Sequence, residues 1–317
     1  DKQEYRDRLD RELAAIAGKE YEDYFLVVAD MVRWAKSQGI YVGPARGSAA
    51  GSVVCWALRI TEVDPIRFGL LFERFVDPTR TDLPDIDVDF EDDRRKEVFA
   101  YMREKYGAEN VAGVGTFARF QSKNTLDDAA RSYRIPLTDI DVVKRHLVER
   151  SSGDQRAELT IQDTLEEFPE AREVFDRYPQ LMIAAGVQGG YRSVGRHAAG
   201  IVVTPEPIAR VAATYKQSEE TDADSILTID WRDAAYLNLM KIDALGLKEL
   251  GILRIICEQV GLTLDDLYAI PFDDPKVFDG FNRGDYLGIF QFGGLATKGV
   301  ASRIHFTSLE QIADVNA

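Results

Sequence analysis

The chain has 317 residues, which is enough for two or three domains with a sizeable core. Its hydrophobic content of 45% is ordinary for a globular protein. Its formal net charge of -15 argues against a general nucleic-acid binder with a basic surface. A local basic patch remains compatible with this charge, because metal-binding acids raise the negative count.

The two cysteines, Cys55 and Cys257, each lie inside an apolar run. This usage argues against a disulfide scaffold and is typical of a reducing compartment, so we expect a cytoplasmic protein without a membrane partner. No signal peptide is recognisable, and no apolar run is long enough to cross a bilayer. Because the chain lacks an initial Met and stops in a predicted helix, we expect a part of a longer protein.

Helices are predicted over residues 4–18 and over the apolar stripe from Tyr21 to Ala35. A strand at 40–42 then leads into a Gly/Ser-rich stretch at 43–52 and a helix from Val53. Glycines let the backbone approach an anion closely, and N–H groups at a helix N-terminus favour negative charge. The stretch therefore predicts a phosphate site, although a tight turn with small residues for helix packing explains it equally well. Its candidate binding residues are Arg46, Gly47, Ser48, Gly51 and Ser52.

Acidic and apolar residues alternate strictly from Pro84 to Phe90. In a β-strand this period places Asp85, Asp87 and Asp89 on one face. Neighbouring carboxylates repel one another, and a hard divalent cation such as Mg²⁺ would relieve the repulsion. The pattern predicts a metal-binding strand, and the alternative is an exposed edge strand with a solvated acidic face.

Further along, Glu91, Asp92 and Asp93 are predicted to begin a helix, because acids in a first turn suit the helix dipole. A strand at 111–116 and a helix at 117–134 follow. Residues 117–190 are helical in pattern, and we expect a helical subdomain inserted into a sheet domain.

Strands are predicted again at 201–204, 226–230 and 239–243. On the last of these, Lys241 and Asp243 share one face. An isolated Asp at a strand end is a turn or cap residue more often than a ligand.

Several basic residues could contact phosphates, or could equally be ordinary surface or ion-pair residues. They are Arg74 and Arg80 before the acidic strand, and Lys123, Arg131 and Arg196 after it.

Five sequence motifs stand in order at 43–52, 71–75, 84–90, 195–200 and 241–247. Together they resemble the alpha subunit of bacterial DNA polymerase III, the C-family replicative polymerases, over essentially the whole chain. The resemblance implies an α+β fold: a polymerase-beta-like nucleotidyltransferase palm with a mixed sheet, an inserted helical thumb and the start of helical fingers. It places the palm at 1–116 and 191–245, the thumb at 117–190 and the fingers at 246–317.

The resemblance also implies a site and a reaction. Asp87 and Asp89 would be the metal-binding pair and Asp243 the third catalytic aspartate, with Asp85 in a supporting role. Two Mg²⁺ ions, for which Mn²⁺ can substitute, would serve transfer of a deoxynucleotide to a primer 3′-hydroxyl with release of pyrophosphate. The stretch at 43–52 would lie near the incoming triphosphate.

The implied partners are primer–template DNA, deoxynucleoside triphosphates and, through regions outside this chain, a sliding clamp and other replisome subunits. Ala45, Ala244 and the residues after Phe292 depart from the family pattern, so we expect a divergent member, of bacterial or phage origin.

Two alternatives stay open. One is a metal-dependent nucleotidyltransferase with a different acceptor. The other is a weakly active or inactive palm–thumb remnant that binds nucleic acid or serves as a scaffold. A glycosyltransferase with an Asp-X-Asp site fits the helical insertion and Asp243 poorly.

Overall fold

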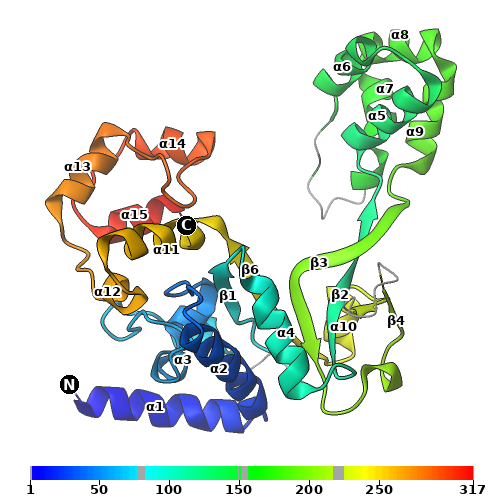
Figure 1. Ribbon diagram of the computed structural model, residues 1–317. Coiled ribbons are helices and arrows are strands. Elements are labelled where there is room, and N and C mark those ends of the chain that lie inside the picture. The colour runs from blue at the N-terminus through cyan, green and yellow to red at the C-terminus, as the bar shows by residue number, and fades with distance from the viewer. Residues whose placement is uncertain (1, 78–82, 149, 151–155, 217–224, 317) are drawn as a thin grey trace. The chain divides into compact units, whose positions relative to one another are not determined.

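The computed structural model describes residues 2–77, 83–148, 150, 156–216 and 225–316 (Figure 1). Arg80 lies outside these residues. The chain forms two compact units, one comprising residues 1–112, 198–213 and 232–317 and the other comprising residues 113–197 and 214–231. The predicted thumb at 117–190 falls within the second unit. The first unit takes in both sides of the predicted boundary between palm and fingers.

The first unit begins with two helices and contains a short sheet. Its elements are α1 (Lys2–Ala17), α2 (Glu22–Ser37), η1 (Gly47–Gly51), α3 (Val53–Ala57), η2 (Phe72–Arg74), β1 (Asp87–Glu91), α4 (Arg95–Tyr106), β6 (Met240–Leu247), α11 (Lys248–Val260), α12 (Leu264–Tyr268), α13 (Pro275–Arg283), α14 (Leu295–Ala301) and α15 (Leu309–Asn316).

The strands of this unit form the order β1-β6-β3, where β3 spans Tyr191–Val203 and enters the unit at its C-terminal end. β1 pairs with β6 in parallel, and β3 pairs with β6 antiparallel. A mixed sheet beside many helices confirms the predicted α+β fold at the level of its class.

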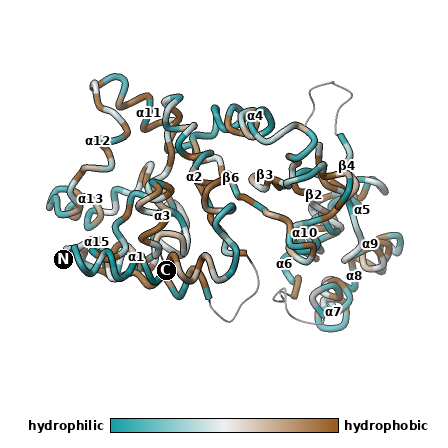
Figure 2. The backbone as a smooth tube through the Cα atoms, turned by 90° about the horizontal axis from the view of Figure 1, so that it is seen from below, coloured by the Kyte–Doolittle hydropathy of each residue, from teal (hydrophilic) through white to brown (hydrophobic). Residues whose placement is uncertain are grey.

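Burial of one face of α2 holds the sheet in place. Phe25 and Val28 of that face are 2% and 0% exposed, and they belong to the same apolar cluster as Val88 and Phe90 of β1. In Figure 2, hydrophobic and hydrophilic residues are mixed along α1 and α2, as expected for helices with one buried face. The apolar half of the alternating stretch is therefore buried, as its period predicts.

The second unit is mostly helical. It contains β2 (Val111–Arg119) from Gly113 onward, α5 (Ser122–Tyr133), α6 (Leu137–Arg145), α7 (Thr160–Glu167), α8 (Pro169–Arg177), α9 (Met182–Val187), the first part of β3, β4 (Thr214–Tyr215) and β5 (Ile226–Leu227). The helices α5 to α9 gather into one bundle (Figure 1) around a core that includes Leu126, Ile140 and Phe175. The helix α10 (Trp231–Tyr236) follows this unit in the chain.

Two predicted helix starts are wrong. Glu91 is the last residue of β1 and is fully buried, so it does not begin a helix. Its carboxylate accepts a hydrogen bond from the Tyr41 backbone N–H at 3.1 Å and pairs with Arg254 at 2.5 Å, which compensates its burial. The helix predicted from residue 117 begins at Ser122, because β2 continues to Arg119.

Among the described helices, none has both the length and the apolar content needed to span a membrane.

We expect Phe25→Ala to lower the free energy of unfolding by about 3–5 kcal/mol, because it leaves a large cavity in this core. The neighbouring Leu26 is 57% exposed, so Leu26→Ala should change it by only about 0.5 kcal/mol. Urea unfolding followed by circular dichroism measures both values. Similar losses for the two variants would contradict the described burial of α2.

Candidate metal centre

Three carboxylates converge at the N-terminal end of β1. The parallel pairing of β1 with β6 places Asp87 opposite Asp243, and Asp85 lies just before β1 begins. Each of the three offers one carboxylate oxygen, and these oxygens all lie within 4.8 Å of one another. We call Asp85, Asp87 and Asp243 the acidic cluster. Oxygen ligands at this spacing suit a hard divalent cation such as Mg²⁺.

Asp243 carries the clearest feature of a metal ligand among the three acids. Its side chain is buried, and among the described residues its Oδ1 atom accepts no hydrogen bond. Its Oδ2 atom accepts a hydrogen bond from Lys241 Nζ at 2.5 Å, and Lys241 also lies 3.5 Å from Asp85 Oδ1. A buried carboxylate oxygen without a partner is costly, and a bound cation would compensate it.

The charges of the acidic cluster act on one another. Burial raises the pKa of Asp87, the charges of Asp85 and Asp243 raise it further, and Arg46 and Lys241 oppose the rise. Burial alone would lower the pKa of Lys241, but the hydrogen bond and charge of Asp243, with Asp85, outweigh it and raise that pKa. Lys241 therefore stays a cation and offsets part of the repulsion.

Asp89 lies outside the acidic cluster. Its side chain is 8% exposed, and its Oδ1 atom forms an ion pair with Arg46 Nη1 at 3.0 Å. The backbone of Gly43 lies against it: a Cβ atom at Gly43 would be 3.0 Å from Asp89 Cβ. Burial raises the pKa of Asp89, and Arg46 opposes the rise. The metal pair predicted as Asp87 and Asp89 stays a prediction, and in this arrangement Asp87 lies in the acidic cluster with Asp85 and Asp243.

One end of the Gly/Ser stretch lies beside the acidic cluster. The turn η1 (Gly47–Gly51) begins with Gly47 in the left-handed region at φ 61°, and a Cβ atom there would lie 3.6 Å from Asp87 Oδ2. Gly47 and Ser48 are exposed. Their N–H groups and the Ser48 hydroxyl are therefore accessible to a phosphate next to the acids.

The other end of the stretch already has an internal anion. Ser52 is fully buried and donates from its hydroxyl to Glu12 Oε2 at 2.8 Å. The backbone N–H groups of Val53 and Val54 donate to Glu12 at 3.1 Å each. Gly51 is buried as well. That Gly51 and Ser52 bind a phosphate stays a prediction, and in the structure the Glu12 carboxylate of α1 accepts the donors at this end.

The basic residues predicted as weak phosphate contacts are dispersed. Arg74 is exposed on η2 in the first unit. Lys123 and Arg131 lie on α5 of the second unit, where Arg131 pairs with Asp128. Arg196 also belongs to that unit, and its side chain lies against Gly113. These predictions stay predictions.

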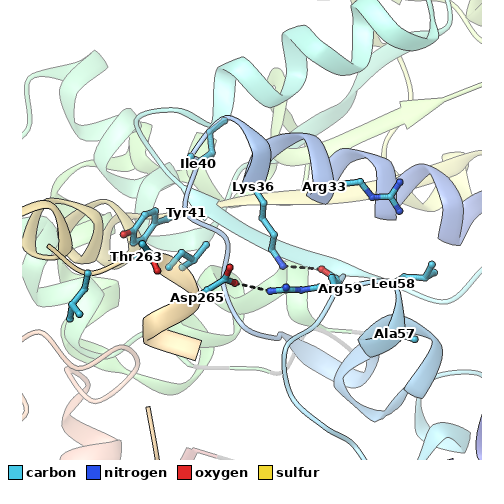
Figure 3. A pocket seen from close by; sticks show the side chains of 12 residues that line it. Arg33, Lys36, Ile40, Tyr41, Ala57, Leu58, Arg59, Thr263 and Asp265 are labelled. Atoms are coloured by element: carbon cyan, nitrogen blue, oxygen red, sulfur yellow. Dashed lines mark hydrogen bonds and ion pairs between the residues drawn. The ribbon is translucent and has the colours of Figure 1, made fainter. Parts of the chain in front are cut away.

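A cavity of about 650 Å³ lies elsewhere in the first unit, between the ends of α2 and α3 and the start of α12 (Figure 3). Two of the cations that line it are paired: Lys36 Nζ lies 2.5 Å from Glu62 Oε1, and Arg59 lies 3.0 Å from Glu62 and 2.8 Å from Asp265. None of the three acids lines it. The chemistry of the acidic cluster therefore does not take place there.

Sequence comparison agrees with the arrangement of these motifs. A profile described as bacterial DNA polymerase III alpha NTPase domain matches residues 1–246, and one described as bacterial DNA polymerase III alpha subunit finger domain matches residues 249–317. The chain belongs to the bacterial DNA polymerase III alpha family. The resemblance read from the motifs is therefore confirmed.

Several relatives carry the name DNA polymerase III subunit alpha. The protein of Thermus aquaticus is 37% identical over 314 residues, which cover 96% of this chain and 25% of that protein. The protein of Caulobacter vibrioides is 35% identical over 317 residues, which cover 98% of this chain and 27% of that protein. The protein of Staphylococcus aureus strain NCTC 8325 is 36% identical over 318 residues, which cover 99% and 29%. The chain thus spans about a quarter of the length of these relatives.

Sequence reasoning missed the roles of Glu12 and Lys241 in this polymerase III alpha chain. Glu12 looks like an ordinary helix residue, and nothing local links it to Ser52, which is 40 positions away. For Lys241 a signal existed, because strand alternation places it on the same face as Asp243.

We expect Asp87→Asn to raise the thermal midpoint of the metal-free chain at pH 7, by an amount on the order of 2 °C. The pKa of Asp87 is raised in the folded chain, so its ionised form costs stability above that pKa. As the pH falls, wild-type Asp87 takes up a proton and the difference between the two chains should shrink. Calorimetry with a chelator at several pH values measures it.

The matched control is Asp10→Asn, since Asp10 is an exposed acid on α1. This variant should leave the midpoint nearly unchanged. A lower midpoint for Asp87→Asn at pH 7 would show that the carboxylates do not repel as described.

Proposed function

We propose that a full-length protein containing this chain is a template-directed DNA polymerase whose metal centre is the acidic cluster. One observation carries the proposal: in a polymerase III alpha family member, Asp85, Asp87 and Asp243 bring carboxylate oxygens within 4.8 Å of one another. The reaction is transfer of a deoxynucleotide from its triphosphate to a primer 3′-hydroxyl, with pyrophosphate as the leaving group.

The residues present fit divalent cations, and Mg²⁺ is the proposed occupant, with Mn²⁺ as a substitute. The three carboxylates would hold the metal, and the unpartnered Oδ1 atom of Asp243 is the observation that supports this fit. When bound, two such ions would favour ionisation of the 3′-hydroxyl and offset the charge of the triphosphate and of the leaving pyrophosphate.

The surrounding residues of the chain have distinct tasks in this proposal. Lys241 keeps Asp85 and Asp243 close together, since its ammonium group lies 3.5 Å and 2.5 Å from them. The exposed N–H groups of Gly47 and Ser48, with the Ser48 hydroxyl, would orient the phosphates of the nucleotide beside Asp87. Arg46 adds positive charge next to this turn, and Asp89 holds its guanidinium in place.

In this proposal Asp85 takes the role that the sequence pattern suggests for Asp89. The support is electrostatic. Asp89 already has a cationic partner in Arg46, whereas the acidic cluster has one ammonium group for three carboxylates. The uncompensated charge is therefore located at Asp85, Asp87 and Asp243, where a divalent cation gains most.

The proposed architecture follows the family. The sheet and helices of the first unit would be the palm, with the fingers beginning at α11, and the helical second unit would be the thumb that grips primer–template DNA. Contacts with a sliding clamp and other replisome subunits would involve parts of the protein outside this chain.

Primer extension by the full-length protein tests these roles with four isosteric variants. We expect Asp87→Asn and Asp243→Asn to reduce kcat about 10³-fold or more, since each removes a ligand from the reacting centre. Asp85→Asn should show a similar loss. Asp89→Asn should mainly raise the KM for the nucleotide, because it releases Arg46.

Binding of Mn²⁺, followed by its electron paramagnetic resonance signal, supplies an independent readout. It should weaken in the Asp85, Asp87 and Asp243 variants and persist in Asp89→Asn. If Mn²⁺ binding instead weakens in Asp89→Asn and persists in Asp85→Asn, the metal pair is Asp87 and Asp89. Incorporation that ignores the template would indicate a nucleotidyltransferase with a different acceptor, and metal-independent DNA binding without incorporation would indicate a remnant.

A further inference from the structure

The buried carboxylate of Glu12 has a full set of hydrogen-bond donors. The side chain, on α1, is 0% exposed. Its Oε1 atom accepts from Arg8 Nε at 2.6 Å and from the Val53 N–H at 3.1 Å. Its Oε2 atom accepts from the Ser52 hydroxyl at 2.8 Å and from the Val54 N–H at 3.1 Å. A carboxylate at a helix N-terminus with this many donors is strongly held.

Arg8 also holds the end of the turn η1, by donating hydrogen bonds to backbone carbonyl groups. Its Nη2 atom donates to the carbonyl oxygen of Gly51 at 2.8 Å and to that of Leu70 at 3.1 Å. Gly51 has no free space, since a Cβ atom there would lie 2.6 Å from the Leu71 carbonyl oxygen. The C-terminal end of η1 is therefore tied to α1 on one side and to the Leu70–Leu71 backbone on the other.

The N-terminal end of the same short turn is the part that lies beside the acids. Gly47 comes close to Asp87, and the preceding Arg46 pairs with Asp89. Only the five residues Gly47–Gly51 separate the two ends. Because the turn is only five residues long, a shift of its C-terminal end displaces its N-terminal end as well.

We propose that Glu12 and Arg8 are positioning residues that hold the Gly47–Gly51 turn against the acidic cluster and so set the affinity for the incoming triphosphate. The inference rests on the polymerase function proposed above. Neither residue belongs to the group of metal-binding acids. Their effect is exerted through the backbone of the turn, which carries the exposed groups of Gly47 and Ser48.

A purely structural role makes a different prediction. A buried ion pair that only stabilises the fold would, when lost, reduce the folded fraction and leave the KM of the remaining enzyme unchanged. A positioning role moves the phosphate-binding groups, so it raises the KM for the nucleotide while the metal-binding acids keep their kcat. The split between KM and kcat therefore separates the two roles.

The test uses the full-length protein with Glu12→Gln and Ser52→Ala. Glu12→Gln replaces one acceptor oxygen by an NH₂ group that faces donors. Ser52→Ala removes one hydrogen bond to Glu12 and leaves the backbone in place, which keeps the test valid if Glu12→Gln fails to fold. In steady-state primer extension we expect the KM for the deoxynucleoside triphosphate to rise about tenfold in Glu12→Gln, and less in Ser52→Ala. The kcat should stay within about threefold of wild type.

Asp30→Asn is the matched control. Asp30 is a partly buried carboxylate on α2 that accepts hydrogen bonds from Tyr101 at 2.8 Å and Tyr106 at 3.0 Å, away from the turn. It should lower the thermal midpoint without changing the KM for the nucleotide. Mn²⁺ binding should remain at the wild-type level in all three variants, since each retains the acidic cluster.

An unchanged nucleotide KM in folded Glu12→Gln or Ser52→Ala would overturn the positioning role and leave the polymerase function intact. An equal rise in Asp30→Asn would also overturn it, because general loosening would then explain the effect. If the folded wild-type protein incorporates no nucleotide, the proposed function fails, and the positioning role fails with it.

Discussion

The parallel register between β1 and β6 is the constraint on which the candidate site depends. It places Asp87 opposite Asp243, while Val88 and Ile242 of the same strands are buried in the core. Burial of the apolar residues holds the strands together although the two carboxylates repel each other. A fold that keeps like charges close in this way stores unfavourable electrostatic energy at one place, as functional sites commonly do.

The acids of this one sequence pattern have different surroundings. Asp89 lies under the backbone of Gly43 and has Arg46 as its partner, so its charge is compensated within the chain. Lys241 pairs with Asp85 and Asp243, while the charges of both Lys241 and Arg46 act on Asp87. The position of an aspartate in the motif does not show whether its charge is compensated within the chain. The cations that lie next to it in the fold do.

The sequence alone predicts the strand and the burial of its apolar side, and it selects Asp87 and Asp243, which the structure places opposite each other. It cannot choose between Asp85 and Asp89, because regular strand pairing begins only at Asp87 and the period of two does not fix the residue before it. Glu91 resembles a helix cap, since a helix follows soon afterwards, and only the tertiary partners Tyr41 and Arg254 show otherwise.

The Gly/Ser stretch shows why a phosphate-loop pattern does not locate a phosphate. Such a pattern supplies unpaired N–H groups, and any anion can satisfy them. At Val53 and Val54 the anion is the chain's own Glu12, 41 and 42 residues away in sequence. The same internal anion that occupies one end of the stretch anchors it, so that the other end, at Gly47 and Ser48, is left exposed beside Asp87. The binding of Glu12 at one end of the stretch thus holds Gly47 and Ser48, at the other end, in a fixed position.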